Sequence, residues 1–269
     1  MPDRRGTWYL PAGSGKHWPE DYERGRPGWP PGVVDIPGLP SSATVLDLAA
    51  GTGKLTRLLI PAYDRVLAVE PQDEMRRLHS RTCPEAGIIS GTAEQIPLEA
   101  SSVDAVFVAE AFHLFGSQRT VAEIARVLRL DGILILMWNF PAEPWEPSIA
   151  VVERLLRERL AQVELEYDPV DLNPRRYTSG EWRQALAESR FGNLHERRLP
   201  NPHTLDRDGL VAFLASMGWI ADLPDETRLP LLQEVKSQLD AAQYHRSWEA
   251  RVYWTRLSCG QRTADRSTN

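Results

Sequence analysis

VLDLAAGTGKL, residues 45–55, is the stretch that decides the fold, because an apolar run passes directly into a glycine turn and a helix. α/β proteins build the site of a nucleotide-like ligand in this way. Two phosphate-binding motifs do not fit the stretch. Thr56 replaces the third glycine of a dinucleotide fingerprint, and Leu48 and Leu55 stand where a P-loop needs a glycine and a hydroxyl residue.

An aspartate inside the predicted strand distinguishes this turn from a phosphate site. Asp47 stands four residues before Gly51, where its carboxylate would repel a pyrophosphate at the helix N-terminus. The same charge favours a ligand whose nearest end is cationic. Glu70 is a second acid at a strand end, 17 residues beyond Gly53, and it can accept hydrogen bonds from both hydroxyls of a ribose.

Composition indicates a globular protein that acts on small molecules. The chain has 269 residues, of which 42% are hydrophobic, and a formal net charge of −6 without a basic block. Cys83 and Cys259 stand far apart, so neither a disulfide framework nor a zinc site is expected. The start lacks a signal-peptide pattern, and the longest apolar run, residues 132–138, is too short for a membrane span. We therefore expect a cytoplasmic protein that contacts neither nucleic acid nor membrane.

Apolar runs alternate with helical patterns from residue 43 onward. This alternation predicts a doubly wound, Rossmann-like α/β fold with a mostly parallel sheet and helices on both faces. The ligand is then expected at the carboxyl ends of the strands. The predicted strands are residues 44–49, 65–70, 87–89, 103–109 and 132–138, and the predicted helices among them are 53–60, 72–81 and 117–129.

After Asn139 the alternation gives way to longer helical segments. Two more predicted strands, 194–199 and 249–257, bring the sheet to seven strands. The predicted helices are 147–163, 179–190, 206–217 and 225–243, and Thr178 and Glu181 are placed as a capping box.

The organisation expected from these patterns has three parts. Residues 1–30 form an N-terminal arm or lid with a short helical turn at 21–24, and residues 31–140 form the ligand-binding core. Residues 141–269 complete the sheet, and their helical insertions, 141–178 and 206–244, form a cap over the substrate.

Several motifs stand in the order of a known family. They are Asp47-x-x-x-Gly51-x-Gly53, the strand-end Glu70, the loop Gly91-Thr92-Ala93-Glu94, the segment Ala111-Phe112-His113-Leu114-Phe115, and Tyr22-x-x-x-Arg26-Pro27-x-Trp29-Pro30 near the start. Together they resemble class I S-adenosylmethionine-dependent methyltransferases of the small-molecule type, in the methyltransferase type 11 branch with an AFHxF motif. The resemblance is strong over residues 19–140 and weak beyond them. It implies S-adenosylmethionine as the cofactor, no metal, and methyl transfer to an O, N or C atom of a small molecule, with aromatic and natural-product acceptors included.

The resemblance also implies which residues form the site. Arg26 would hold the carboxylate of the cofactor, and Met75 would offer an apolar surface to its adenine. His113 would either take a proton from the acceptor or only pack and hydrogen-bond. The residues implied for cofactor binding are Tyr22, Arg26, Asp47, Ala49, Gly51, Gly53, Glu70, Pro71, Gln72, Met75, Thr92, Ala93, Glu94, Ala109 and Glu110, and those implied for catalysis are His113, Glu110 and Tyr22.

Several alternatives stay open at this level. A protein that binds S-adenosylmethionine without methyl transfer, such as a cyclase or a regulatory module, would carry the same motifs. A nicotinamide-dependent oxidoreductase is a weaker alternative, because Thr56 and Asp47 oppose it. Monomer and homodimer are equally compatible with the sequence. Aromatic residues near the expected cap either line a site for the acceptor or belong to the core: Trp18, Trp29, Trp145, Tyr177, Trp182 and Trp219.

Overall fold

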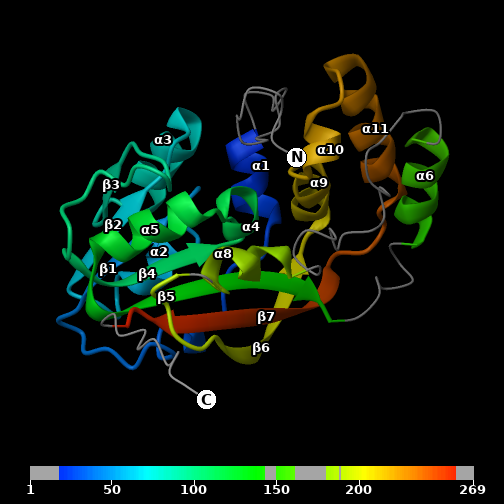
Figure 1. Ribbon diagram of the computed structural model, residues 1–269. Coiled ribbons are helices and arrows are strands. Elements are labelled where there is room, and N and C mark those ends of the chain that lie inside the picture. Colours follow the sequence, from blue (N-terminus) through cyan, green and yellow to red (C-terminus); the bar gives the residue numbers. More distant parts are fainter. Residues whose placement is uncertain (1–17, 143–149, 161–179, 188, 259–269) are drawn as a thin grey trace.

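Seven strands form one sheet in the order β3-β2-β1-β4-β5-β7-β6 in the computed structural model, which describes residues 18–142, 150–160, 180–187 and 189–258 (Figure 1). β1 pairs in parallel with β2 and β4, and β5 pairs in parallel with β4. β7 runs antiparallel to both β5 and β6. The predicted mostly parallel, seven-stranded sheet is confirmed. The strands are β1 (Thr44–Leu48), β2 (Arg65–Val69), β3 (Gly87–Ile89), β4 (Val103–Ala109), β5 (Leu128–Pro141), β6 (His195–Leu205) and β7 (Tyr244–Arg256).

Both faces of the central strands are buried, as their nearly continuous apolar sequences require. In β5, Leu134 and Leu136 pack on one face of the sheet, while Ile133 and Ile135 pack on the other. Side chains of α4 (Phe112–Phe115), α5 (Gln118–Val127) and α8 (Gln184–Ala187) join the first cluster. Those of α2 (Thr56–Leu59) and of the 3₁₀ turn η1 (Pro31–Val33) join the second. The core therefore consists of two layers of side chains with the sheet between them.

Several element boundaries differ from those predicted. The helix expected at 53–60 is reduced to α2, because Gly51 and Gly53 have positive φ and keep the preceding residues in a turn. The helix expected at 117–129 ends at Val127, since Leu128 already has extended backbone. α3 (Asp73–Thr82) agrees with the prediction to within one residue.

The last strands are longer than predicted because they pair beyond their apolar parts. β5 continues past the predicted residue 138 to Pro141, which pairs with Trp248 of β7. β6 extends to Leu205 and carries Pro200 and Pro202, which an edge strand tolerates. Apolar patterning does not predict these extensions, because they contain polar residues such as Asn139 in β5 and Asn201 and His203 in β6.

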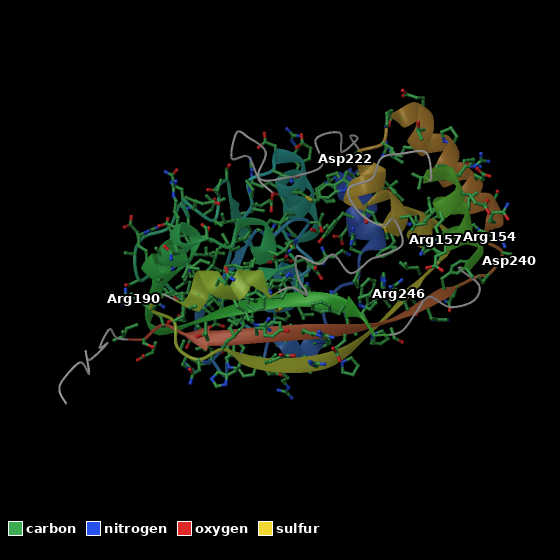
Figure 2. The ribbon with its side chains drawn as sticks, turned by 45° about the vertical axis from the view of Figure 1, so that its right-hand side comes forward. Arg154, Arg157, Arg190, Asp222, Asp240 and Arg246 are labelled. Carbon is green, nitrogen blue, oxygen red and sulfur yellow. The ribbon has the colours of Figure 1, made fainter. Side chains whose placement is uncertain are left out.

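Helices after β5 form a separate hydrophobic cluster with the first part of β7, here called the cap cluster. Within it the guanidinium of Arg246 lies 4.6 Å from the ring centroid of Trp248, and burial lowers the pKa of Arg246 to about 10. Figure 2 shows Arg154, Arg157 and Arg246 on the same side of the molecule. The cap helices are α6 (Ala150–Leu160), α9 (Arg207–Ala215), α10 (Gly218–Ala221) and α11 (Asp225–Gln238).

Corrections to the C-terminal predictions are small. The helix expected at 179–190 is a 3₁₀ turn, η3 (Glu181–Arg183), followed by α8, and α11 ends at Gln238 instead of residue 243. Thr178 of the expected capping box lies outside the described residues, as do Trp145, Tyr177 and Cys259. In the described part of the chain, no helix combines the length and the apolar character that a membrane span needs.

The helical turn predicted near residues 21–24 is a full helix, α1 (Trp18–Gly25), that stands between the core and the cap. Figure 1 shows α1 between α3 and α9. Gly25 allows close contact with α9, because a Cβ at this position would overlap the backbone of Phe213. Glu23, on the same helix, forms an ion pair with Arg57 of α2 at 2.6 Å. α1 therefore joins the two parts of the molecule.

Candidate functional site

Two residues with strained backbone mark the carboxyl ends of β1 and β4. Ala49 has φ 60° and Glu110 has φ 55°, a left-handed conformation that costs residues other than glycine about 1–3 kcal/mol. β1 and β4 are adjacent, and the chain order of the sheet reverses between them. Ligands of doubly wound sheets bind at this reversal. Ala109, also predicted for the site, is the last residue of β4 and is half-buried.

Glu70 is tied to the glycine turn through its carboxylate. Its Oε2 accepts a hydrogen bond from the Gly51 N–H at 3.0 Å, and its Oε1 accepts one from the Gln72 N–H at 2.9 Å. The residue is 5% exposed, and burial raises the pKa of its carboxyl. A carboxylate oxygen has a second lone pair, so both oxygens can still accept ribose hydroxyls. That role stays a prediction.

Asp47 belongs to a buried polar chain that the sequence does not reveal. Thr56 Oγ1 donates to Asp47 Oδ2 at 2.6 Å and lies 2.9 Å from His79 Nε2. The Thr56 hydroxyl hydrogen points to Asp47, so Thr56 Oγ1 can only accept from His79. A neutral His79 therefore carries its hydrogen on Nε2 and donates it to Thr56. Burial raises the pKa of Asp47 to about 7 and lowers that of His79 to about 4. Thr56, which excludes the dinucleotide fingerprint, thus orients the acid of the motif.

The two glycines of the motif serve different purposes. A Cβ on Gly51 would meet nothing within 4 Å, so this side of the turn is open to a ligand. A Cβ on Gly53, with φ 90°, would overlap Cys83 Sγ of the segment that follows α3. The expectation that both glycines make room for the cofactor therefore fits Gly51, whereas Gly53 permits close packing within the protein.

Six residues predicted to bind the cofactor follow β2 and β3, which are neighbours in the sheet. Met75 and Ala93 are buried, Gln72 and Glu94 are half-buried, and Pro71 and Thr92 are exposed. Glu94 Oε1 is buried and, like Asp47 Oδ1, has no hydrogen-bond partner among the described residues. Two orphaned acceptors fit a ligand that has an ammonium near one of them and an adenine amino group near the other.

Tyr22 and Arg26 approach the same strand ends from α1 and the residue after it. Burial raises the pKa of Tyr22 to about 12, while Arg26 acts in the opposite direction and Glu110 and Glu70 add to the rise. Tyr22 therefore lies within electrostatic reach of acids from both β4 and β2. Arg26 Nε donates to Ser216 Oγ at 2.8 Å and its Nη2 donates to Ser216 O at 3.0 Å. Two of the donors expected for the cofactor carboxylate are thus used by the end of α9.

His113 accepts a hydrogen bond that defines its neutral form. Trp138 Nε1–H donates to His113 Nδ1 at 3.1 Å. An indole N–H can only donate, so the single proton of a neutral His113 must be on Nε2. In this tautomer Nδ1 accepts from Trp138 and Nε2 carries the hydrogen, so Nε2 can act as a donor. The catalytic role of His113 stays a prediction.

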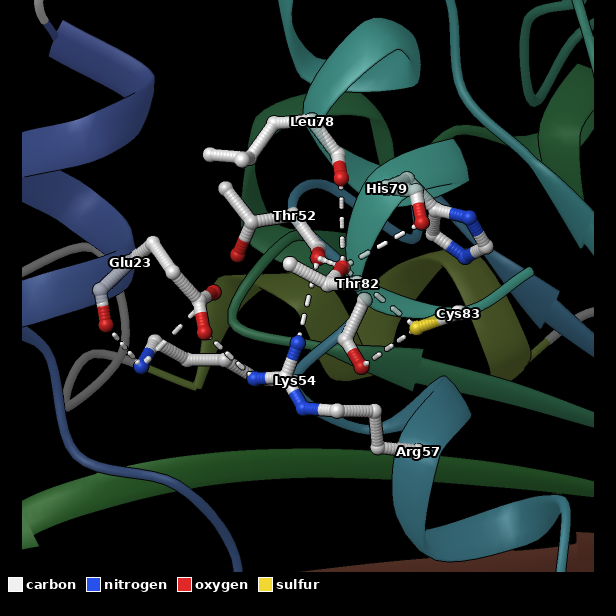
Figure 3. A network of polar contacts seen from close by, with 9 residues as sticks. Glu23, Thr52, Lys54, Arg57, Leu78, His79, Thr82 and Cys83 are labelled. Carbon is white, nitrogen blue, oxygen red and sulfur yellow. Dashed lines mark hydrogen bonds and ion pairs between the residues drawn. The ribbon is translucent and has the colours of Figure 1, made fainter.

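Contacts of Glu23 hold α1 against the residues that follow the Gly51-x-Gly53 motif. Glu23 O accepts from Lys54 Nζ at 2.6 Å, and the Glu23 carboxylate pairs with Arg57 (Figure 3). Figure 3 also shows the Thr52 carbonyl accepting from Thr82 Oγ1, at 2.7 Å. Sequence reasoning missed these partners, although Lys54 stands inside the quoted motif. A lysine directly after the glycines was the available signal.

A second set of hydrogen bonds holds the segment after α1 to the end of β5. Asn201 Nδ2 donates to Gly28 O and to Asn139 Oδ1, each at 2.8 Å. The backbone N–H of Asn139 donates to Glu110 Oε1 at 2.6 Å. These amides hold the segment after α1 beside Glu110. No sequence pattern had singled them out.

Two of the aromatic residues predicted near the cap belong to the hydrophobic core. Trp29 and Trp182 are 8% and 4% exposed and belong to the two clusters of the sheet. Trp18 is half-buried, and its Nε1–H donates to Ser216 O at 3.3 Å. The side chain of Trp219 lies outside the described residues. Among the described residues, no group of three His, Cys, Asp or Glu side chains could hold a metal ion.

Comparisons with known proteins agree with this fold. Residues 46–136 match the family described as methyltransferase domain. The uncharacterized methyltransferase Mb3374 of Mycobacterium bovis is 50% identical over 119 residues, so the chain spans about half (49%) of that relative's length and 44% of its own. An uncharacterized methyltransferase-like protein of Schizosaccharomyces pombe is 29% identical over 227 residues, 82% of each chain. A solved structure, a type II methyltransferase from Anaeromyxobacter dehalogenans, has a TM-score of 0.65 at 23% identity and covers 87% of this chain and 99% of that one, which shows the fold alone.

Proposed function

We propose that the chain is a class I S-adenosylmethionine-dependent methyltransferase, which transfers a methyl group from S-adenosylmethionine to a small molecule. The observation that carries this proposal is the set of buried acids at the ends of β1 and β2. Asp47 has an orphaned oxygen, and Glu70 is held by Gly51 and Gln72. Buried carboxylates suit a cationic, phosphate-free ligand and oppose a pyrophosphate. When bound, S-adenosylmethionine would supply a methyl carbon that accepts a nucleophile's electron pair because it is attached to a sulfonium.

The residues of the chain contribute mainly by positioning. Asp47 and Glu94 would accept from the two ends of the cofactor, and Gly51 leaves one side of the glycine turn open to it. Holding two reactants at attack distance is worth up to ~7–11 kcal/mol of the barrier. We propose that the arm (1–30) and the insertions (141–178 and 206–244) shape the acceptor side, since α1 brings Tyr22 near the strand-end acids and Ser216, after α9, binds Arg26.

Incubation with S-adenosylmethionine labelled in its methyl group and a small-molecule cell extract tests the function. We expect a labelled product that is absent from a boiled-protein control. Binding of the cofactor without any labelled product would favour the cyclase or regulatory alternative.

The elution of the protein from a size-exclusion column with light scattering decides between monomer and homodimer.

Calorimetry should show that S-adenosylmethionine and S-adenosylhomocysteine bind at one site and that NADH does not. Replacing Glu70 with alanine should weaken S-adenosylmethionine by about 1–3 kcal/mol, the range for a lost hydrogen bond to a charged group. Glu74→Ala, an exposed glutamate four residues further on, is the control and should leave the affinity unchanged. Micromolar NADH binding, or an unchanged affinity in folded Glu70→Ala, would remove this site from consideration.

His113→Phe should lower the free energy of unfolding by about 1–3 kcal/mol, because the buried indole N–H of Trp138 loses its acceptor. We expect turnover per folded molecule to stay within a few fold. If His113 were the catalytic base, turnover would instead fall by roughly 10²–10⁴-fold. Thermal midpoint and turnover on the same sample separate the two cases, with His245→Phe, at an exposed position, as the control.

A further inference from the structure

We propose that Glu110 takes the proton of the methyl acceptor, so that the acceptor is a compound that presents an O–H or N–H to this carboxylate; the inference rests on the proposed methyl transfer. It assigns the base to a carboxylate at the end of β4 instead of to His113, and it narrows the acceptor class. Acceptors whose attacking atom carries no proton, such as sulfides and tertiary amines, are excluded.

The backbone and one oxygen of Glu110 are fixed. Its N–H donates to Met137 O at 2.9 Å, and its left-handed φ of 55° turns the chain sharply at the end of β4. Oε1 accepts from the Asn139 N–H at 2.6 Å, and Asn139 is itself held by Asn201. Strained conformations persist where the surroundings over-determine them, and they concentrate at functional sites. A carboxylate held in this way keeps its direction through a reaction cycle.

The charged and titratable groups around Glu110 come from the N-terminal segment. Arg26 is near enough to lower the pKa of Glu110, and the Tyr22 phenol is near enough for Glu110 to raise its pKa. On the side of β5, the partner is the backbone N–H of Asn139. Burial outweighs these contacts and raises the pKa of Glu110 to about 7, which is suited to accepting a proton near neutral pH.

The hydrogen bonds of the other candidate bases at the strand ends favour other roles for them. The Glu70 carboxylate holds Gly51 and Gln72, and Asp47 holds Thr56, both on the side of β1 and β2 where the cofactor is expected. His113 receives the indole hydrogen of Trp138. Glu110 is the acid at the strand ends on which Arg26 acts, and Arg26 contacts the end of α9, on the side from which the acceptor would come.

The proposed step balances as follows. A lone pair of the acceptor O or N forms the new bond to the methyl carbon, and the carbon–sulfur bond breaks with its electron pair going to sulfur, which becomes a neutral thioether. The positive charge thus moves from sulfur to the acceptor atom. Glu110 takes the proton from that atom and becomes a neutral carboxylic acid, and it later returns the proton to water. A carboxylate beside the acceptor stabilises the charge where it develops.

The test uses the full chain with Glu110→Gln, which keeps an oxygen for the Asn139 N–H but accepts a proton far less readily. Labelled methyl transfer to the extract should fall by about 10²–10⁴-fold, while the dissociation constant for S-adenosylhomocysteine stays within threefold. The wild-type transfer rate should fall as pH drops below about 7, and the variant should not show this pH dependence. Glu226→Gln, at an exposed position of α11, is the matched control.

A readout independent of turnover accompanies the rate. In protein labelled with ¹³C at the glutamate carboxyl, one resonance missing from Glu110→Gln should titrate near pH 7 in the S-adenosylhomocysteine complex. If Glu110→Gln fails to fold, Glu110→Asp, which keeps the charge on a shorter side chain, should show a smaller loss and retain the pH limb.

Three results would overturn the inference, and they differ from failure of the function itself. One is transfer by folded Glu110→Gln within threefold of wild type; another is a product whose methylated atom carried no proton beforehand. The third is a Glu110 resonance that titrates near an ordinary glutamate value. The absence of any labelled product from wild type would instead contradict the proposed methyl transfer, and the inference would fall with it.

Discussion

Replacing Gly25 with alanine should lower the free energy of unfolding by about 1–3 kcal/mol or more, the cost of overpacking a well-fitted interior. A Cβ on Gly25 would overlap backbone atoms of Phe213 and Ala212 in α9. Backbone atoms of a helix cannot rotate away as the end of a flexible side chain can. α1 would therefore have to move away from α9, which would break the contacts of Trp18 and Arg26 with Ser216.

The same displacement should reach the site. Arg26 and Tyr22 would lose their positions near Glu110, and Glu23 holds α1 to Arg57 on the other side. We expect the affinity for S-adenosylhomocysteine to fall several fold along with stability. Denaturant unfolding and calorimetry on one sample measure both quantities.

Gly28→Ala is the matched control for this substitution. Gly28 lies in the same segment, but a Cβ there would meet nothing within 4 Å. Its carbonyl, which accepts from Asn201, is unaffected by the added methyl group. Equal stability of Gly25→Ala and Gly28→Ala would show that α1 and α9 are not packed as described.

The core of this molecule was predictable because its signals are local. Strand periodicity placed β1 to β5 to within a few residues, except that β5 begins earlier and ends later, and the Asp47-x-x-x-Gly51 spacing predicted a ligand at the carboxyl end of β1. Glu70 follows from the same logic one strand later. Each of these features needs only residues that are close in sequence.

The connections of α1 were not predictable for the opposite reason. Gly25 and Phe213 meet from positions far apart in the chain, and glycine before an Arg-Pro pair reads locally only as the end of a helix. Ser216 and Asn201 carry no motif, yet they hold Arg26 and Gly28. The tautomer of His113 likewise depends on Trp138, which sequence pattern assigns only to a buried strand.

The affinity for S-adenosylmethionine should rise with pH below about 7, and Asp47 should carry part of this dependence. Its pKa is raised from 3.8 to about 7 by burial, so the free protein holds a proton there between these values. A cationic group beside Asp47 Oδ1 favours the ionised form, so binding must expel that proton. Each proton expelled makes the affinity rise up to tenfold per pH unit, and the rise should level off above about 7.

The free energy of unfolding should change with pH in the direction opposite to the affinity. Because the folded form binds this proton more tightly than the unfolded form, the contribution of Asp47 to the free energy of unfolding is largest below pH 3.8. It decreases as pH rises toward about 7. The bound cation reverses this loss by stabilising the ionised carboxylate.

Asp47→Asn separates this acid from Glu70, whose pKa burial also raises. The amide cannot ionise, so the plot of log affinity against pH should be shallower by up to one proton between pH 5 and 7. At pH 8 the affinity should be lower by about 1.5–3 kcal/mol, the range for hydrogen bonds to charged groups. Calorimetry at pH 6 in buffers of different ionisation enthalpy counts the protons directly, with exposed Asp64→Asn as the control. A slope and proton count for Asp47→Asn equal to those of wild type would place the cation away from Asp47.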